Sequence, residues 1–148
     1  MSPSVALREI TRDNVDEVMD LAVAPEQDEL VAPNSVSIAQ SHYEDRSWMR
    51  GIYVDDTPVG LILTIEDPER PFFYLWRLMI AAAHQGRGHG RAAVLQAIDR
   101  IREVPSAQEL KVSVAPDEGN AVGFYERLGF VDTGEVHDGE MVFVLPLR

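Results

Sequence analysis

The sequence predicts a mixed α/β domain in which strands and helices alternate along the chain, residues 1–148. Short apolar or alternating stretches bounded by glycine, proline and aspartate indicate strands, and apolar residues at helical spacing indicate helices. The expected order is β-α-α-β-β-β-α-β-α-β-β. A hydrophobic content of 45% in 148 residues is enough to bury one core, and no repeat interrupts the pattern.

The N-terminal part predicts one strand and two helices. Residues 5–10 alternate weakly and are typical of an edge strand. We expect Asp13 to cap a helix, because the apolar residues after it recur at helical spacing. These residues are Val15, Val18, Met19, Leu21 and Ala22. An acidic connector, residues 25–33, leads to a second helix that Asn34 or Ser35 is expected to cap and that runs to about His42 or Arg46.

Three strands are predicted next. Residues 49–55 and 59–65 flank a stretch of turn residues, and a nine-residue apolar run follows at 72–80. Pro68 and Pro71 bracket the loop before this run.

The C-terminal half begins with a long helix from about Gly88 to Glu103. Its predicted buried stripe is Ala92, Leu95, Ala97, Ile98 and Ile101. A strand, a short helix and two strands complete the chain at residues 110–115, 120–128, 130–136 and 141–147. Asp138-Gly139 joins the last two strands as a hairpin turn.

A glycine-rich segment between the apolar run and the long helix predicts an anion-binding loop. Gly86, Gly88 and Gly90 allow the backbone to adopt left-handed angles and to approach a ligand closely. The first N–H groups of the following helix have no partner inside the helix and attract negative charge. Residues 70–98 contain no acidic side chain, although the chain has 25 acidic and 13 basic residues. We therefore expect an anionic ligand here.

The spacing of these glycines does not fit two common nucleotide sites. A Rossmann fingerprint needs a third glycine where this chain has Arg91, and a Walker A loop needs Gly-Lys-Ser/Thr. Gln85-x-x-Gly88-x-Gly90 instead resembles the acetyl-CoA loop of the GNAT superfamily of N-acetyltransferases, with the pattern Gln/Arg-x-x-Gly-x-Gly/Ala. Residues 124–130, Phe-Tyr-Glu-Arg-Leu-Gly-Phe, are similar to the second signature of that superfamily.

This resemblance covers essentially the whole chain and implies a GNAT fold. The fold has a central, mostly antiparallel twisted sheet of six or seven strands flanked by about four helices. The implied activity is transfer of the acetyl group of acetyl-CoA directly to a primary amine. No covalent enzyme nucleophile and no metal are expected, and the absence of cysteine excludes a thiolate for either role.

The resemblance also assigns the cofactor contacts. Leu78, Met79 and Ile80 would lie along the pantetheine arm. The backbone of the loop would surround the pyrophosphate, through Gln85, Gly86, Arg87, Gly88, His89, Gly90 and Arg91. The guanidinium groups of Arg87 and Arg91 suit phosphate oxygens because each can donate two parallel hydrogen bonds.

Tyr125 is the predicted catalytic residue. It matches the superfamily tyrosine, and a phenol is protonated at neutral pH and can donate its proton to a departing thiolate. Where the superfamily usually has asparagine, seven residues earlier, this chain has Glu118. Whether Glu118 or Asn120 contacts CoA is left open. The general base is also open, with Glu66, Asp67, Asp28 and Glu29 as the candidate acids.

Residues 27–34, 51–53, 58–60 and 77–80 resemble bacterial diamine/polyamine (spermidine/spermine) acetyltransferases. The resemblance implies that Asp28 and Glu29 hold the charged nitrogens of a polyamine, and Tyr74 and Trp76 would add cation–π contacts. Another amine acceptor (an aminoglycoside, an amino acid or a protein N-terminus) and a non-catalytic CoA-binding sensor remain as alternatives.

The net charge of −12 agrees with a small cationic amine as substrate and disfavours nucleic acid and anionic membranes as partners. No apolar run approaches the ~20 residues that span a bilayer, and the first residues do not resemble a signal peptide. We expect a cytoplasmic location. The oligomeric state is open, with a homodimer among the alternatives.

Overall fold

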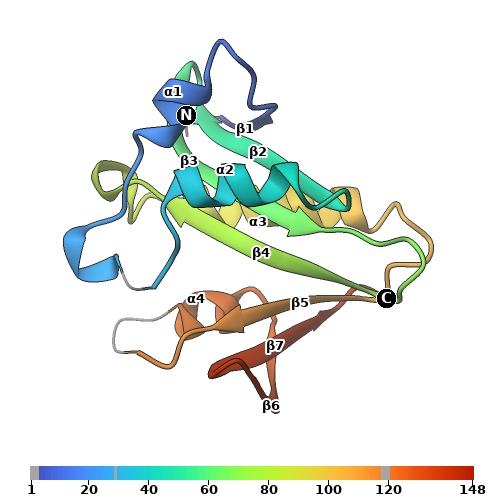
Figure 1. Ribbon diagram of the computed structural model, residues 1–148. Helices are drawn as coiled ribbons and strands as arrows, with labels where there is room; N and C mark the ends of the chain where they lie inside the picture. Colours follow the sequence, from blue (N-terminus) through green and yellow to red (C-terminus); the bar gives the residue numbers. More distant parts are fainter. Residues whose placement is uncertain (1–3, 29, 118–120) are drawn as a thin grey trace.

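The computed structural model describes residues 4–28, 30–117 and 121–148, which form a seven-stranded sheet with helices on both faces (Figure 1). The strands are β1 (Val5–Arg8), β2 (Ser47–Val54), β3 (Thr57–Ile65), β4 (Phe72–Ile80), β5 (Glu109–Val114), β6 (Val131–His137) and β7 (Glu140–Pro146). The helices of the described residues are α1 (Val15–Met19), α2 (Asn34–His42), α3 (His89–Ile101) and α4 (Val122–Arg127), with short 3₁₀ helices η1 (Pro25–Gln27) and η2 (Ala82–His84). The predicted order and the mixed α/β class are confirmed.

The sheet has the strand order β1-β2-β3-β4-β5-β7-β6. Every neighbouring pair is antiparallel except β4 and β5, which are parallel. The sheet is therefore mostly antiparallel, as the resemblance implies. Strand β1 lies at one edge, as expected, and β6 forms the other, exposed along its whole length. The turn between β6 and β7 has positive φ angles at Asp138 (50°) and Gly139 (79°), which confirms the predicted hairpin.

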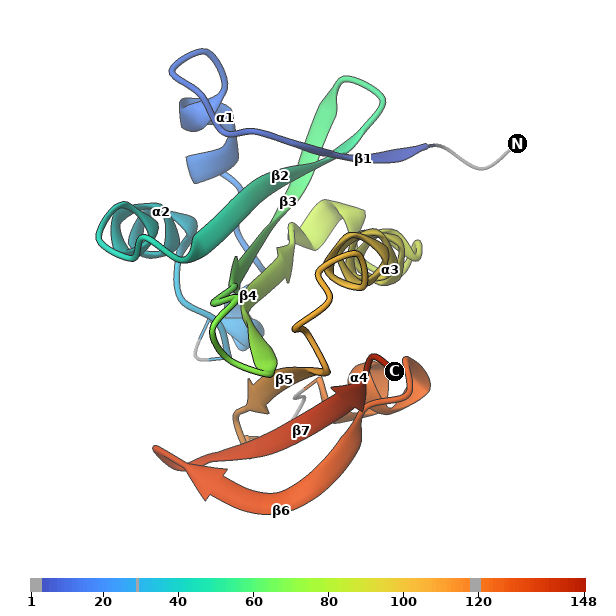
Figure 2. The same ribbon diagram turned by 90° about the vertical axis from the view of Figure 1, so that its right-hand side faces the viewer.

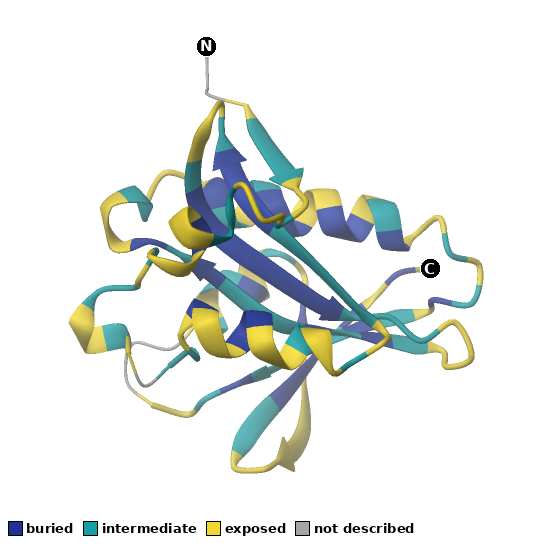
Figure 3. Ribbon diagram, turned by 45° about the horizontal axis from the view of Figure 1, so that its top comes forward, coloured by how far each residue is buried: buried dark blue, intermediate teal, exposed yellow. Residues whose placement is uncertain are grey.

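Two apolar clusters pack on opposite faces of the sheet. In Figure 2, α1 and α2 lie on one side of β2–β4 and α3 on the other. The cluster under α1 and α2 includes Val18, Ile38 and Met79, whereas the larger cluster under α3 and α4 includes Ile98 and Phe143. Figure 3 shows that buried residues are concentrated in the central strands and on the sheet-facing side of α3. The central strands are therefore held from both sides.

Both predicted helix caps in the N-terminal part are wrong. The residue before α1 is Asn14, whose side chain accepts a hydrogen bond from the Thr11 amide (2.7 Å) and does not cap the helix. Asn34 is the first residue of α2, and its buried side-chain amide donates to the Val18 carbonyl at 2.8 Å. The sequence predicts Asn34 as a helix cap, but in the structure its side chain forms a tertiary hydrogen bond that connects α2 to α1.

The predicted stripe of α3 is only partly correct. The buried residues of this helix are His89, Ala93, Val94, Ala97, Ile98 and Ile101. Leu95 is exposed and Ala92 is only partly buried, contrary to the prediction. Ala97, Ile98 and Ile101 are buried as predicted, whereas in the first half of the helix the buried positions are Ala93 and Val94. Residues 92–95 are all apolar, so the sequence alone does not decide which of them face the core.

Strand β4 combines a bulge with a separation from β5. The register with β3 shifts between Thr64, which pairs with Leu75, and Leu63, which pairs with Arg77, so that Trp76 is the extra residue. The pairing with β5 covers only residues 72–75 of β4. Figure 1 shows the two strands diverging beyond that point. Among the described residues, 76–80 therefore have no strand neighbour on the β5 side.

Candidate active site

A cavity of about 760 Å³ lies where β4 and β5 separate. Residues 74–80 of β4 form one wall and residues 112–115 at the end of β5 form another. The connector between α1 and α2, Gln85 and Tyr125 also line the cavity, together with Ile65, Ala121 and two residues of the β6–β7 hairpin. The cavity thus brings together the connector, β4, Gln85 and Tyr125, which the sequence assigned to one site, with the end of β5 and the β6–β7 hairpin, which it did not.

The backbone of β4 presents polar groups to this cavity. The Ala81 amide donates to the Val59 carbonyl at 2.8 Å. Because hydrogen-bonded and non-hydrogen-bonded pairs alternate in an antiparallel ladder, the backbone groups of Ile80 and Leu78 turn away from β3, and those of Met79 turn toward it. Leu78 and Ile80 are thus oriented for backbone pairing with an extended ligand. Met79 can contribute only its side chain, which lies in the cluster under α1 and α2.

The loop between β4 and α3 has the backbone geometry that its glycines predict. Gly86 (φ 77°) and Gly88 (φ 83°) are both left-handed, and Gly88 immediately precedes α3. The Ala92 amide donates to the Gly88 carbonyl (3.1 Å), which leaves the amides of residues 89–91 without a partner inside the helix. Exposed glycines next to free helix amides form a cradle that suits a pyrophosphate.

The charged residues of this loop differ in their surroundings. Arg87 and Arg91 are exposed, so their guanidinium groups are free to reach a phosphate. His89 is buried, and its burial, with the charges of Arg87 and His84, lowers the pKa of its imidazole. His89 is therefore neutral at pH 7 and offers a ligand its backbone amide, not a charged side chain.

Gln85 has a different role from the other loop residues. Its Nε2 donates to the Ile80 carbonyl and to Gln27 Oε1, both at 2.8 Å. The side chain thus connects the loop to the end of β4 and to η1 of the connector. Sequence reasoning placed Gln85 in the cofactor loop but did not anticipate this bridge.

Tyr125 of α4 lines the cavity. Its ring makes edge-to-face contacts with Phe124 (centroids 5.0 Å apart) and Phe130 (5.3 Å). The residue is only 7% exposed, yet it lines the cavity. Burial raises the pKa of its phenol above the usual value, because the phenolate would lose its hydration. Tyr125 is therefore protonated at neutral pH and is positioned by aromatic packing.

The polar residues on the cavity walls come from three segments. Asp28 of the connector lines the cavity, as predicted, and so do His137 and Glu140 of the β6–β7 hairpin, which sequence reasoning missed. The order β5-β7-β6 brings this hairpin beside the free end of β5, and no local motif signals that proximity. Arg77 of β4 also lines the cavity. Burial lowers the pKa of its guanidinium, and the charge of Glu140 opposes this effect.

The predicted aromatic residues Tyr74 and Trp76 also line the cavity. Trp76 packs against the cluster under α1 and α2, and the Arg77 guanidinium lies 5.2 Å from its ring centroid. The bulge places Trp76 and Arg77 next to each other on this wall. Because the Arg77 guanidinium already lies over one face of Trp76, we expect the ring of Tyr74 to be the more available one for a cationic ligand.

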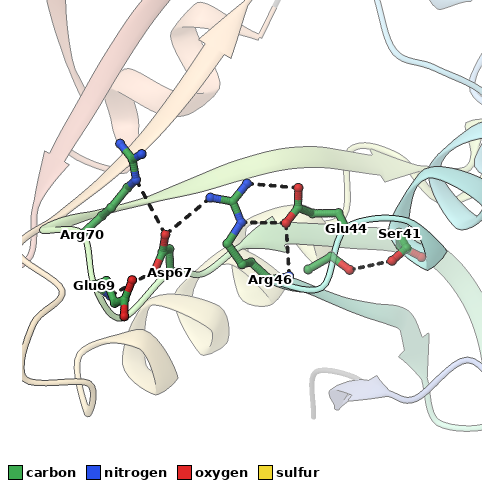
Figure 4. A network of polar contacts seen from close by, with 7 residues as sticks. Ser41, Glu44, Arg46, Asp67, Glu69 and Arg70 are labelled. Atoms are coloured by element: carbon green, nitrogen blue, oxygen red, sulfur yellow. Dashed lines mark hydrogen bonds and ion pairs between the residues drawn. The ribbon is translucent and has the colours of Figure 1, made fainter.

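Two of the acids considered as a general base, Glu66 and Asp67, form ion pairs outside the cavity. Glu66 accepts a hydrogen bond from Thr64 (2.6 Å) and forms an ion pair with Arg100. Asp67 lies between Arg46 and Arg70 in a surface network (Figure 4). Neither residue lines the main cavity, which corrects their assignment to the substrate side. Glu29, Glu118 and Asn120 lie outside the described residues.

Residues 12–130 match the Acetyltransferase (GNAT) family, and the chain belongs to this family. The fold and the site thus define an acetyltransferase with acetyl-CoA as the acetyl donor. The chain is 25% identical to the spermine/spermidine N(1)-acetyltransferase of Bacillus subtilis (strain 168), over 97% of this chain and 99% of that protein. It is 29% identical to the spermidine N(1)-acetyltransferase of Vibrio cholerae, over 64% of this chain and 56% of that protein.

Solved structures confirm the fold. The spermidine N-acetyltransferase of Vibrio cholerae, in complex with CoA and spermine, superimposes with a TM-score of 0.75 at 17% identity, over 97% of this chain and 95% of that chain. An acetyltransferase from Thermus thermophilus gives the same TM-score at 19% identity, over 97% of both chains. In the part of the chain that the structure describes, no helix has the length and apolarity needed to cross a membrane.

Proposed function

We propose that this protein transfers the acetyl group of acetyl-CoA to a primary amine of a polyamine such as spermidine or spermine. The observation that carries the proposal is the composition of the cavity walls. The free backbone of β4 and a protonated Tyr125 share one cavity with the carboxylates of Asp28 and Glu140. The relatives named for spermine and spermidine acetylation support the choice of acceptor.

The residues present fit acetyl-CoA. Leu78 and Ile80 would pair with the pantetheine arm, and the amides after Gly88 would receive the pyrophosphate, with Arg87 and Arg91 beside them. When bound, acetyl-CoA supplies an activated acyl group as a thioester. The protein therefore has to position the amine, accept its proton and supply a proton to the leaving sulfur.

Tyr125 supplies that last proton. A phenol that burial keeps protonated is suited to donate as negative charge develops on sulfur. Its two ring contacts, with Phe124 and Phe130, hold its position without a covalent or metal constraint. The proton lost by the incoming ammonium passes to a basic group on the cavity walls, for which Asp28, His137 and Glu140 are the described candidates.

The carboxylates of Asp28 and Glu140 hold the charged nitrogens of the acceptor. They come from opposite ends of the chain, and both line the cavity. A polyamine can place one ammonium against each carboxylate while a terminal amine reacts. Their attraction for the substrate is electrostatic and weakens as salt rises.

An acceptor that carries a carboxylate, such as an amino acid, is the second candidate. Arg77 lines the cavity, and its Nε is buried without a hydrogen-bond partner among the described residues. Its Nη groups donate to the Trp76 carbonyl (3.1 Å) and to Gln40 (3.2 Å). A carboxylate that approached this edge of Arg77 would satisfy the buried Nε.

A substrate panel tests the proposal. Purified protein is mixed with acetyl-CoA and spermidine, spermine, a simple monoamine, an aminoglycoside or an amino acid, and free thiol is measured over time. Mass spectrometry then identifies the acetylated product. We expect the highest kcat/KM for spermine or spermidine. Preference for the amino acid would support the role of Arg77 in binding a carboxylate, and CoA binding without thiol release would identify a sensor.

A further inference from the structure

Three separate segments meet at the side-chain amide of Gln85. One hydrogen of Nε2 goes to the Ile80 carbonyl at the end of β4, and the other goes to Gln27 Oε1 in η1, each at 2.8 Å. Gln27 Oε1 also accepts a hydrogen bond from the Ala24 amide at 3.2 Å. The bridge is therefore complete: both donor hydrogens of Gln85 are used, and the acceptor oxygen of Gln27 is used twice.

The bond to Ile80 fixes a backbone group at the cofactor site. The Ile80 carbonyl faces away from β3, toward the side where β4 has no strand neighbour. The Ile80 carbonyl accepts the hydrogen bond from Gln85, and the Ile80 amide is left for a ligand. Any change in the loop that moves Gln85 is thus transmitted to the strand along which pantetheine lies in the proposed function.

The bond to Gln27 fixes the connector. The turn around η1 closes on itself, because the Gln27 amide donates to the Ala24 carbonyl (2.8 Å) and the Leu30 amide donates to the Gln27 carbonyl (2.9 Å). Asp28 and Leu30, next to this turn, line the cavity. The position of Asp28 on the cavity wall therefore depends on how Gln27 is held.

We propose that the Gln27–Gln85 bridge couples acetyl-CoA binding to the order of the acceptor wall, and that Gln85 and Gln27 are positioning residues. Cofactor binding fixes the loop, Gln85 transmits this to η1, and Asp28 is then held where the amine binds. The inference rests on the proposed function for the identity of the acceptor. By linkage, an acceptor that orders η1 must in turn increase the affinity for CoA by the same factor.

Four variants separate the bridge from other effects. Gln85→Met removes both hydrogen bonds with little change in size, and Gln27→Met removes the arm to the connector but retains the bond from Gln85 to Ile80. Gln27→Glu keeps an acceptor oxygen for both Gln85 and Ala24. The control is Gln96→Met, because Gln96 lies on α3 and donates to the Val5 carbonyl, outside the cavity.

The first readout is amide hydrogen exchange with and without CoA, which needs neither an acceptor nor turnover. In the wild type, CoA should slow exchange both in the loop and at the amides of Ala24, Gln27 and Leu30. In Gln27→Met, CoA should still protect the loop but no longer protect this turn, and Gln27→Glu should restore the protection. Protection of the turn in Gln27→Met equal to that in the wild type would overturn the proposal. Loss of protection in Gln96→Met would do the same.

The second readout is the calorimetric Kd of CoA with and without saturating spermine. Couplings between sites are typically about 5–150-fold. We expect a ratio in this range for the wild type and for Gln96→Met, and a ratio near one for Gln27→Met and Gln85→Met. The double variant Gln27→Met/Gln85→Met should change this ratio little more than either single variant, because both substitutions break the same contact. A wild-type ratio well above one that Gln27→Met and Gln85→Met retain would contradict the proposal.

The two readouts distinguish failure of this inference from failure of the proposed function. If CoA protects the loop and the turn but spermine does not change the Kd of CoA, the coupling role of the bridge is supported and spermine is not the acceptor. If spermine is acetylated normally and CoA protects only the loop, the function stands and the bridge has no coupling role.

Discussion

Gly60 of β3 lies directly against the Met79 carbonyl of β4, and a Cβ atom at Gly60 would overlap that oxygen. It would also lie 2.9 Å from Ile80 Cδ1 and 3.3 Å from Ile52 Cδ1. The absence of a side chain at this one position therefore lets β3 and β4 pair closely at Leu78–Ile80, the segment assigned to pantetheine. The cofactor strand β4 therefore depends on a glycine of the neighbouring strand β3.

The substitution Gly60→Ala should push β3 and β4 apart. Overpacking of a well-packed site typically costs about 1–3 kcal/mol, and we expect a loss of this size in the free energy of unfolding, measured with urea. CoA affinity should fall as well. Gly90→Ala is the control for stability alone, since its Cβ would make only ordinary contacts, the nearest at 3.5 Å from Ile80 Cγ1. Equal stability of Gly60→Ala and the wild type would contradict the close approach.

The loop assignment predicts that charge at Gly88 matters beyond its left-handed backbone. Gly88→Asn and Gly88→Asp introduce side chains of similar size that tolerate this conformation better than most, but only Asp adds a negative charge beside the expected pyrophosphate. We expect Gly88→Asp to lower CoA affinity about tenfold or more relative to Gly88→Asn, by calorimetry at low salt. Equal affinities of the two variants would place the pyrophosphate elsewhere.

The acceptor site predicts a charge-dependent loss when a cavity carboxylate is neutralised. Asp28→Asn and Glu140→Gln should each raise KM for spermine by about two- to fivefold, the range of a solvent-accessible ion pair, and should affect a monoamine less. Both should weaken the salt dependence of kcat/KM. Asp99→Asn is the control, because Asp99 is an exposed residue of α3 that does not line the cavity. If spermine and the monoamine respond alike, these acids only solvate the surface.

The ion pair of Glu44 and Arg46 predicts an effect of acid on stability (Figure 4). Hydrogen bonds from Arg46 lower the pKa of the Glu44 carboxyl from 4.5 to about 2. A lowered pKa in the folded state stabilises the protein above the unfolded value, and this stabilisation disappears as the pH falls from about 4.5 toward 2. The Tm advantage of the wild type over Glu44→Gln should therefore be small, salt-sensitive and present at pH 6, and it should vanish near pH 2.

The neighbouring substitution Asp45→Asn serves as a control for that pH profile, since the structure gives Asp45 no ion pair among the described residues. Its Tm difference from the wild type should change much less over the same range. Parallel melting curves for the wild type and Glu44→Gln from pH 6 to pH 2 would mean that the pair makes no contribution in solution.

Local signals in the sequence predicted the features that depend on local geometry. The glycines at 86 and 88 predicted left-handed backbone, and the apolar run predicted β4 with the bounds that the structure has, Phe72–Ile80. These features follow from steric freedom and periodicity within a few residues. The order of elements followed for the same reason.

Features that depend on tertiary contacts were not predictable in this way. His137 and Glu140 reach the cavity because β7 pairs with β5, a contact between strands separated by α4 and β6 in the chain. The sequence allowed Glu66 as a general base, but in the fold it forms an ion pair with Arg100 of α3. The side chain of Gln85 also found its partner 58 residues away. Periodicity cannot report such pairings.

The most direct test of the account is acetyl transfer to spermine by the wild type and by Tyr125→Phe. The wild type should form acetylspermine in amounts equal to the CoA released, as measured by mass spectrometry and thiol assay. Removal of the hydroxyl should lower kcat by about 10²–10⁴-fold, the usual contribution of a general acid, with little change in CoA affinity or Tm. Because the phenol pKa is raised, Tyr125 should cause no loss of wild-type activity below about pH 10. CoA release without acetylspermine, or near-normal kcat in Tyr125→Phe, would contradict the account.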